Sequence, residues 1–278
     1  MTTLKSPPRR YVSFVLYGDK ALYLNGALEN ARLIPSVYPG WKGRFYVSDD
    51  VPARISEQLR SLDAEVIAFR REDWPGSSAM LIRFMAANEI GVDTVVFRDA
   101  DSRVNPREAM AVKEWLETPT ATFHLMHEAL HDAKFGEVMG GMWGVRRATK
   151  GDTTPPLAGI DEAIQAFVNC SDASSYGADM VFLSEWLVPQ LRHINTVHHC
   201  EGDPKRPLGL LASDISSRGY PETAFAGFVG APVNCSCGYG AFAITGCEHC
   251  SRKVPGSVAS RLGAGGPDVM AALAGFLA

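Results

Sequence analysis

Two carboxylates one residue apart, Asp99 and Asp101, directly follow a short apolar run at residues 94–97. That run is rich in β-branched and aromatic side chains, so it predicts a buried strand, and ligands of open α/β sheets collect beyond the carboxyl ends of such strands. Both side chains of an extended Asp-x-Asp point the same way and can hold one hard divalent cation, which also takes phosphate oxygens. The pair therefore predicts a cation-assisted diphosphate site, with a solvated turn as the alternative.

The elements that must position this pair alternate along the first hundred residues. Strands are expected at 11–17, 41–47, 64–69 and 94–97, with helices at 20–36, 51–62 and 80–90 between them. Such alternation is typical of a parallel sheet with crossover helices. No glycine-rich phosphate loop follows the first strand, because neither G-x-G-x-x-G nor G-x-x-x-x-G-K-[ST] is present there. Diphosphate binding is therefore expected to depend on a metal.

Further helices and strands are expected downstream, and the whole chain is expected to divide into three parts. Helices are predicted at 106–116, 161–168 and 179–191, and strands at 122–126 and 139–146. We expect a flexible lead at 1–10, a catalytic domain at 11–232 and a Cys-rich, Ala/Gly-rich extension at 233–278. The apolar end of the extension predicts a terminal helix packed on the core, with weak membrane-surface contact as the alternative.

Length and composition exclude several classes of protein. With 278 residues, 46% of them hydrophobic, the chain can bury a full core. Its net charge of -4 argues against a general nucleic-acid binder, which needs clustered Lys and Arg. No apolar run approaches the length of a transmembrane segment, and no leader follows the first charged residues. We expect a cytoplasmic protein.

Several segments together resemble small bacterial and viral glycosyltransferases of the GT-A type, a family with an Asp-x-Asp motif. They are residues 13–18, 26–31, 38–47, 98–103, 107–115, 123–124, 140–145, 176–183 and 228–230. The resemblance implies a Rossmann-like, mostly parallel central sheet flanked by helices. It also implies a Mn²⁺ or Mg²⁺ ion, a nucleotide-sugar donor and a hydroxyl acceptor such as a glycan, for example in surface polysaccharide synthesis.

In such a transferase Asp99 and Asp101 would be the protein ligands of the metal. The resemblance implies a third ligand from a histidine late in the chain, and residues 197–199 are the best placed source. His198 is preferred over His199. The alternative for this pair is an exposed turn.

Four residues are expected to bind the donor. Arg83 and Arg98 can pair with phosphates or orient the two carboxylates. An ordinary salt bridge on the helix surface is the alternative for Arg83, and a supporting partner that does not touch the donor is the alternative for Arg98. Tyr17 and Asp19, at the end of the first strand, lie where a base and ribose are expected. Core packing of Tyr17 and helix capping by Asp19 are the alternatives.

Acceptor binding and base catalysis are assigned to three residues. Gly141 permits close approach beside the indole of Trp143, which would form a platform for a sugar ring. A core position is the alternative for this tryptophan. Asp179, which opens a predicted helix, is the expected general base or hydroxyl-orienting group. Helix capping is its alternative, and with retention of configuration it would instead stabilise an oxocarbenium-like state.

A cysteine cluster near the C-terminus predicts a structural Zn²⁺ site. Cys235 and Cys237 form C-x-C, and Cys247 and Cys250 form C-x-x-C, with His249 as a spare ligand. Four thiolates match structural zinc, while free thiols or a disulfide are the alternatives. This ion would stabilise the extension and would not be the catalytic metal.

Two other functions compete with a metal-dependent glycosyltransferase. A sugar-1-phosphate nucleotidyltransferase uses a similar sheet and metal, but it normally carries a Gly-rich, basic loop where this chain has Tyr-Gly-Asp-Lys at 17–20. A catalytically silent, zinc-containing binding or scaffold protein is the third possibility, and the intact Asp99 and Asp101 argue against it.

Overall fold

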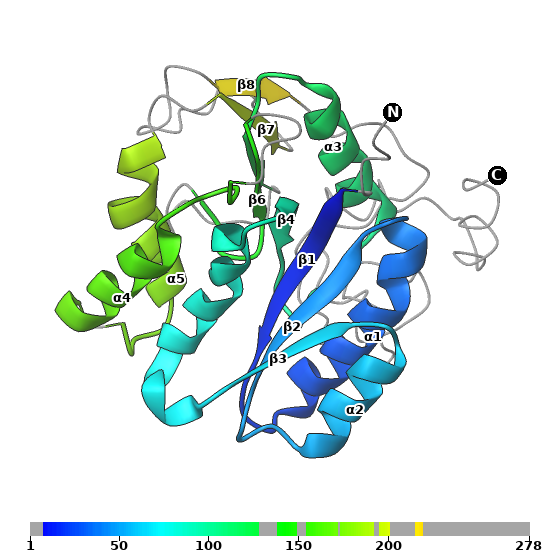
Figure 1. Ribbon diagram of the computed structural model, residues 1–278, viewed down its shortest axis with the longest axis vertical. Helices are drawn as coiled ribbons and strands as arrows, with labels where there is room; N and C mark the ends of the chain where they lie inside the picture. The colour runs from blue at the N-terminus through cyan, green and yellow to red at the C-terminus, as the bar shows by residue number, and fades with distance from the viewer. Residues whose placement is uncertain are drawn as a thin grey trace, which may run out of the picture.

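A mixed β-sheet forms the centre of the computed structural model, which describes residues 8–127, 138–148, 154–171, 173–191, 195–200 and 215–218. Within these residues the sheet has eight strands in the order β3-β2-β1-β4-β6-β5-β7-β8 (Figure 1). The strands are β1 Arg9–Leu16, β2 Lys42–Ser48, β3 Glu65–Phe69, β4 Val92–Phe97, β5 Phe123–His127, β6 Trp143–Arg146, β7 Thr196–Cys200 and β8 Ile215–Arg218. Only β6 is antiparallel to its neighbours, so the predicted α/β class with a mostly parallel sheet is confirmed.

Helices cover both faces of the sheet, and each face has its own apolar core. The first face is covered by α1 (Ala21–Val37), α2 (Ala53–Ser61) and α3 (Pro106–Glu117) (Figure 1). The second is covered by η2 (Gly76–Asn88, cyan), α4 (Ile160–Cys170) and α5 (Ala178–Val181) (Figure 1). The described residues also include three short helices: η1 Arg71–Asp73, η4 Phe182–Leu187 and η5 Val188–Leu191.

The sheet has a topological switch point between β1 and β4. From β1 the chain crosses through α1 to β2 on the first face, whereas from β3 it crosses through η2 to β4 on the second face. Ligands of such sheets bind outside the carboxyl ends of the strands at the switch point. Tyr17 directly follows β1 and Asp99 lies two residues after β4, so both lie at this point.

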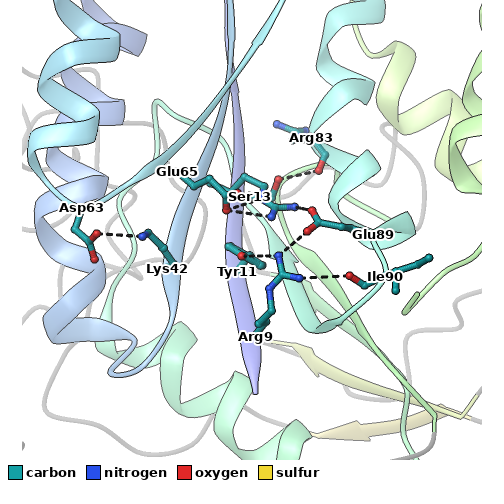
Figure 2. A network of polar contacts seen from close by, with 10 residues as sticks. Arg9, Tyr11, Ser13, Lys42, Asp63, Glu65, Arg83, Glu89 and Ile90 are labelled. Atoms are coloured by element: carbon teal, nitrogen blue, oxygen red, sulfur yellow. Dashed lines mark hydrogen bonds and ion pairs between the residues drawn. The ribbon is translucent and has the colours of Figure 1, made fainter. Parts of the chain in front are cut away.

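The helix η2 is held at its start and in its middle. It is a 3₁₀-helix that begins earlier than the predicted helix at 80–90. At its start the Ser77 amide donates to the Ser174 carbonyl at 2.9 Å. In its middle the buried Ser13 hydroxyl of β1 donates to the Arg83 carbonyl at 2.8 Å (Figure 2). These bonds fix the backbone of Arg83 against the sheet.

At the amino ends of the strands, opposite the carboxylate pair, an ion-pair network holds the chain at the end of η2 (Figure 2). Glu89 accepts from Arg9 at 2.5 Å and also from Arg44, whose side chain is fully buried. Arg44 bonds Glu65 as well, at 3.0 Å, and its guanidinium carbon lies 3.9 Å from the centre of the Tyr11 ring. These carboxylates raise the pKa of Arg44 although burial lowers it. The network therefore links β1, β2 and β3 to the end of η2.

Three differences from the sequence prediction concern irregular segments. β6 is shorter than the predicted strand because residues 139–142 turn, with the Met142 amide on the Met139 carbonyl at 3.0 Å. The predicted helix at 179–191 changes from α to π and then to 3₁₀ near Pro189, which has no amide hydrogen to donate. Residues 196–200 form the strand β7, where a turn was the alternative to a metal ligand.

Of the predicted domain boundaries, only the N-terminal one lies within the residues that the structure describes. β1 begins at Arg9, inside the lead expected at 1–10. The extension at 233–278 lies outside the described residues, as do its four cysteines. Among the residues that are described, no helix has the length and hydropathy needed to span a bilayer.

Candidate functional site

The carboxylate pair lies in a short turn beyond β4. The Ser102 amide donates to the Asp99 carbonyl at 3.2 Å, and the Asp99 side chain is 36% exposed. Burial, together with the neighbouring negative charge of Asp99, raises the pKa of Asp101 to about 6. A carboxylate that burial and a neighbouring negative charge hold back from ionising favours a nearby cation, because a cation stabilises its charged form.

A buried guanidinium stands behind the pair. Arg83 donates to Asp99 Oδ1 at 2.5 Å and to Asp179 Oδ2 at 2.7 Å, so one arginine joins two carboxylates. The side chains of Arg83 and Asp179 are only 2% and 3% exposed. Both carboxylates raise the pKa of Arg83 against the effect of burial. With Asp101 included, three carboxylates face two guanidinium groups, Arg83 and Arg103, and the site carries surplus negative charge.

Glycines lie so close to these charged groups and to the turn that carries them that a side chain would not fit there. A Cβ on Gly141 would lie 2.2 Å from Asp99 Oδ2, and one on Gly140 would lie 1.9 Å from Asp179 Oδ2. On the other side a Cβ on Gly26, in α1, would lie 1.9 Å from the Ala100 carbonyl oxygen. The group that lies close to Gly141 in the structure is Asp99, while the approach of an acceptor to Gly141 stays a prediction.

Tyr17 lies beside this charged centre, at the end of β1. Burial raises the pKa of its phenol, whereas the positive charges of Arg83 and Arg71 lower it. The Arg71 guanidinium carbon lies 4.8 Å from the centre of the Tyr17 ring. Asp50, just past β2, accepts from the Gly18 amide at 2.9 Å. The carboxyl ends of β1 and β2 thus carry a polar cluster next to the carboxylate pair.

Asp50 and Arg71 were not predicted from the sequence. Both follow predicted strands, at 41–47 and 64–69, so the signal was their position beyond a carboxyl end. Asp19, which was predicted, is exposed in the turn before α1. It does not cap the helix, because Lys20 is the N-cap residue and makes no side-chain capping bond. A ribose contact by Asp19 stays a prediction.

The assignment of Arg98 to donor binding is wrong. Its side chain is 2% exposed and is bonded to Glu108 of α3 at 3.0 Å and to the Tyr38 hydroxyl at 3.4 Å. Tyr38 and α3 belong to the first face of the sheet, whereas Arg83 lies on the second. Successive side chains of an extended chain point to opposite faces, so Arg98 points away from the face that Asp99 shares with Arg83.

The assignment of His198 as third metal ligand is also wrong. His198 lies in β7, in the row Phe97–Trp143–Leu125–His198 across β4, β6, β5 and β7. Three strand spacings correspond to about 14 Å, too far for a ligand shared with Asp99. The His198 ring instead contacts His127 Nδ1 through Nε2 at 2.9 Å. In the part of the chain described here, no group of three His, Cys, Asp or Glu side chains is arranged to hold a metal.

Trp143 and Asp179 are corrected in the same way. Trp143 is fully buried and its ring packs on Phe84, Phe97 and Phe123, so it presents no face to a sugar ring. Asp179 is buried against Arg83, and burial raises the pKa of its carboxyl although Arg83 lowers it. A carboxylate enclosed in this way positions Arg83 and does not reach an acceptor hydroxyl. It does not cap α5 either, because Gly177 is the N-cap residue.

Comparison with known proteins gives distant structural likenesses only. No family model and no curated protein sequence matches this chain. A glucosyl-3-phosphoglycerate synthase from Mycobacterium tuberculosis, in complex with Mn²⁺, UDP-glucose and phosphoglyceric acid, is 15% identical over 72% of this chain and 73% of its own, with a TM-score of 0.40. A second structure of that synthase is 14% identical over 73% of this chain and 75% of its own, with a TM-score of 0.39.

A structure described only as a mycobacterial protein is 16% identical, with a TM-score of 0.35. The match covers 50% of this chain and 53% of the other, so this chain spans about half the length of that protein. At these TM-scores the likenesses assign no residue role, and the geometry of the site stands by itself.

Proposed function

We propose that this chain is a metal-dependent glycosyltransferase of the GT-A type, which moves a sugar from a nucleotide-diphosphate donor to a hydroxyl acceptor such as a glycan. The observation that carries the proposal is the Asp99 and Asp101 pair at the switch point of the sheet, backed by the buried Arg83 that bonds Asp99 and Asp179. The buried Arg83 supports the proposal over an ordinary solvated turn. A buried charge is costly unless it is paired, and a solvated turn needs no such group behind it.

The residues present fit a hard divalent cation. Asp99 and Asp101 supply carboxylate oxygens, which Mg²⁺ and Mn²⁺ prefer. The pKa of Asp101 is raised first by burial and then by the negative charge of Asp99, and a cation would compensate that charge. A site with two protein carboxylates leaves room for phosphate oxygens and water. When bound, the ion would neutralise charge that develops on the leaving diphosphate.

The chain's own residues would do three things. Arg83 fixes Asp99 in one orientation, and Asp179 fixes Arg83. Tyr17 and Arg71 provide an aromatic ring and a positive charge next to the carboxylates, where a nucleoside phosphate of the donor would lie. Preorganised groups of this kind contribute to catalysis because they need no rearrangement when charge develops.

The nucleotidyltransferase alternative is disfavoured by the turn after β1. A phosphate-binding loop offers free backbone amides, yet the Gly18 amide here donates to the Asp50 carboxylate at 2.9 Å. The amide that follows the first strand therefore bonds a carboxylate from the turn after β2 and is not left free for an anion.

The test is thermal stabilisation by UDP-, GDP-, CMP- and dTDP-sugars, each with and without Mn²⁺. A donor at 100 times its Kd adds about 2.7 kcal/mol to the free energy of unfolding. For a domain of this size, that raises Tm by about 5–10 °C. We expect a Mn²⁺-dependent rise with one nucleotide class, lost in Asp101→Ala and kept in Asp73→Asn, a change at an exposed aspartate. No rise with any donor would contradict the proposal and favour the silent scaffold.

A further inference from the structure

Exposed apolar and aromatic side chains gather around the carboxylate site. Among the described residues the large ones are Tyr23, Ile90, Tyr176 and Val181, with exposed fractions of 36%, 70%, 84% and 42%. Tyr23 lies in the first turn of α1, and Tyr176 and Val181 lie at α5, whose Asp179 bonds Arg83. Ile90 alone lies at the opposite edge, before the start of β4. Grouped exposed side chains of this kind mark binding surfaces.

The loop that carries Tyr176 is fixed on both sides. Before it, the Ser174 carbonyl accepts from the Ser77 amide at 2.9 Å, and a Cβ on Gly76 would lie 2.3 Å from that same oxygen. After it, Gly177 adopts φ +86°, a left-handed conformation that favours glycine, and begins α5. The Tyr176 ring is therefore displayed to solvent from an anchored backbone, which is how a preformed contact residue is presented.

Tyr23 approaches the same place from the other face of the sheet. Burial raises the pKa of its phenol, and the charges of Asp101, Tyr176 and Asp99 raise it further, so these groups are within short electrostatic range of one another. One turn further along α1, Gly26 packs on the Ala100 carbonyl between the two carboxylates. Tyr23 in α1 and Tyr176, just before α5, thus lie near the carboxylate pair from two sides of the sheet.

We propose that Tyr23 and Tyr176 form an aromatic clamp that holds the pyranose ring of a carbohydrate acceptor at the Asp99 and Asp101 site. The inference rests on the proposed function and names its acceptor class as a sugar ring. A pyranose has an apolar face of C–H groups that packs on an aromatic ring, while its hydroxyls bond to polar groups. Tyr23 also lies within electrostatic range of Tyr17, so the clamp adjoins the Tyr17 and Arg71 cluster, and the nucleotide measurement below separates the acceptor from the donor.

The experiment is saturation-transfer NMR on the full chain, with methyl glycosides of glucose, mannose and galactose as probes. In the wild type we expect saturation of the ring C–H protons of at least one glycoside. Tyr23→Ala and Tyr176→Ala should each weaken binding by about threefold to tenfold, the effect of one aromatic contact. Tyr176→Phe should keep binding, because it retains the ring. Ile90→Ala is the matched control and should behave as the wild type.

The clamp is overturned if the wild type binds no glycoside, or if binding is unchanged in both alanine variants. Stabilisation by UDP, GDP and dTDP with Mn²⁺ is measured in parallel on the same proteins. If the wild type responds to a nucleotide and the alanine variants respond equally, the clamp serves the acceptor. If the alanine variants lose the nucleotide response, the rings serve the donor and the inference is wrong. If the wild type lacks that response, the proposed function fails, while glycoside binding still decides the clamp.

Discussion

Replacing Arg83 by methionine tests whether the buried guanidinium holds the site together. Methionine keeps much of the aliphatic volume and removes the charge. The change leaves Asp179, with a side chain only 3% exposed, without its cationic partner. Asp99 also loses its ion pair with Arg83, but its side chain is 36% exposed, so water compensates for most of that lost interaction. The free-energy cost therefore comes mainly from Asp179.

The magnitude follows from the proton that Asp179 must then take up. Protonating a carboxyl of ordinary pKa, about 3.9, costs roughly 4 kcal/mol at pH 7 and roughly 1.5 kcal/mol at pH 5. Burial already raises the pKa of Asp179, and loss of Arg83 removes the main opposing charge. Because the folded pKa of the variant lies above the unfolded one, its stability rises as the pH falls through that interval. We expect a loss of about 4 kcal/mol at pH 7 that shrinks to about 2 kcal/mol at pH 5.

The assay is urea unfolding followed by tryptophan fluorescence at both pH values. Arg54→Met, at an exposed position of α2, is the matched control and should change the free energy of unfolding by less than about 0.5 kcal/mol. Adding Asp179→Asn to Arg83→Met should recover at least half of the loss, because the uncompensated carboxylate is gone. A loss equal at pH 5 and pH 7, or no rescue in the double variant, would refute this reasoning.

Three further predictions follow from single contacts. Gly141→Ala should weaken Mn²⁺-dependent nucleotide binding at least tenfold in calorimetry, because its Cβ would lie 2.2 Å from Asp99 Oδ2; unchanged affinity would contradict this. Ser13→Ala should lower the free energy of unfolding by about 1–3 kcal/mol, because the buried Arg83 carbonyl loses its donor; an unchanged urea midpoint would argue otherwise. The pKa of Glu89 is lowered by its arginine partners, so Glu89→Gln should unfold at lower urea than the wild type at pH 7, and the two midpoints should converge below about pH 4; a constant gap would exclude the ion pairs as its cause.

The parts of the fold that were predictable are those with local signals. Local apolar patterns predicted the strands at 11–17 and 94–97 and the helix at 20–36. The place of Asp99 and Asp101 was predictable as well, because the pair comes directly after one of these strands. The alternation of Arg98 and Asp99 across the sheet was also available, since neighbours in an extended chain face opposite sides. That signal alone would have removed Arg98 from the donor site.

The remaining parts depend on strand order and on distant contacts. No local pattern shows that β7 lies beyond β5, which is what separates His198 from the carboxylate pair. Nor does one show that Trp143 stands opposite Phe97 in the core, or that Asp179 meets Arg83 across 96 positions of sequence. Buried polar partners of this kind are chosen by the tertiary fold and leave no periodic trace in the sequence.

The most direct test of the central claim is the release of nucleoside diphosphate from a panel of nucleotide sugars, measured with Mn²⁺ and with EDTA. We expect release from one class of nucleotide sugar that requires the metal and falls at least a hundredfold in Asp101→Asn, while Asp73→Asn releases at the wild-type rate. Metal-independent release, or an Asp101→Asn variant as active as the wild type, would show that the chain is not a metal-dependent glycosyltransferase.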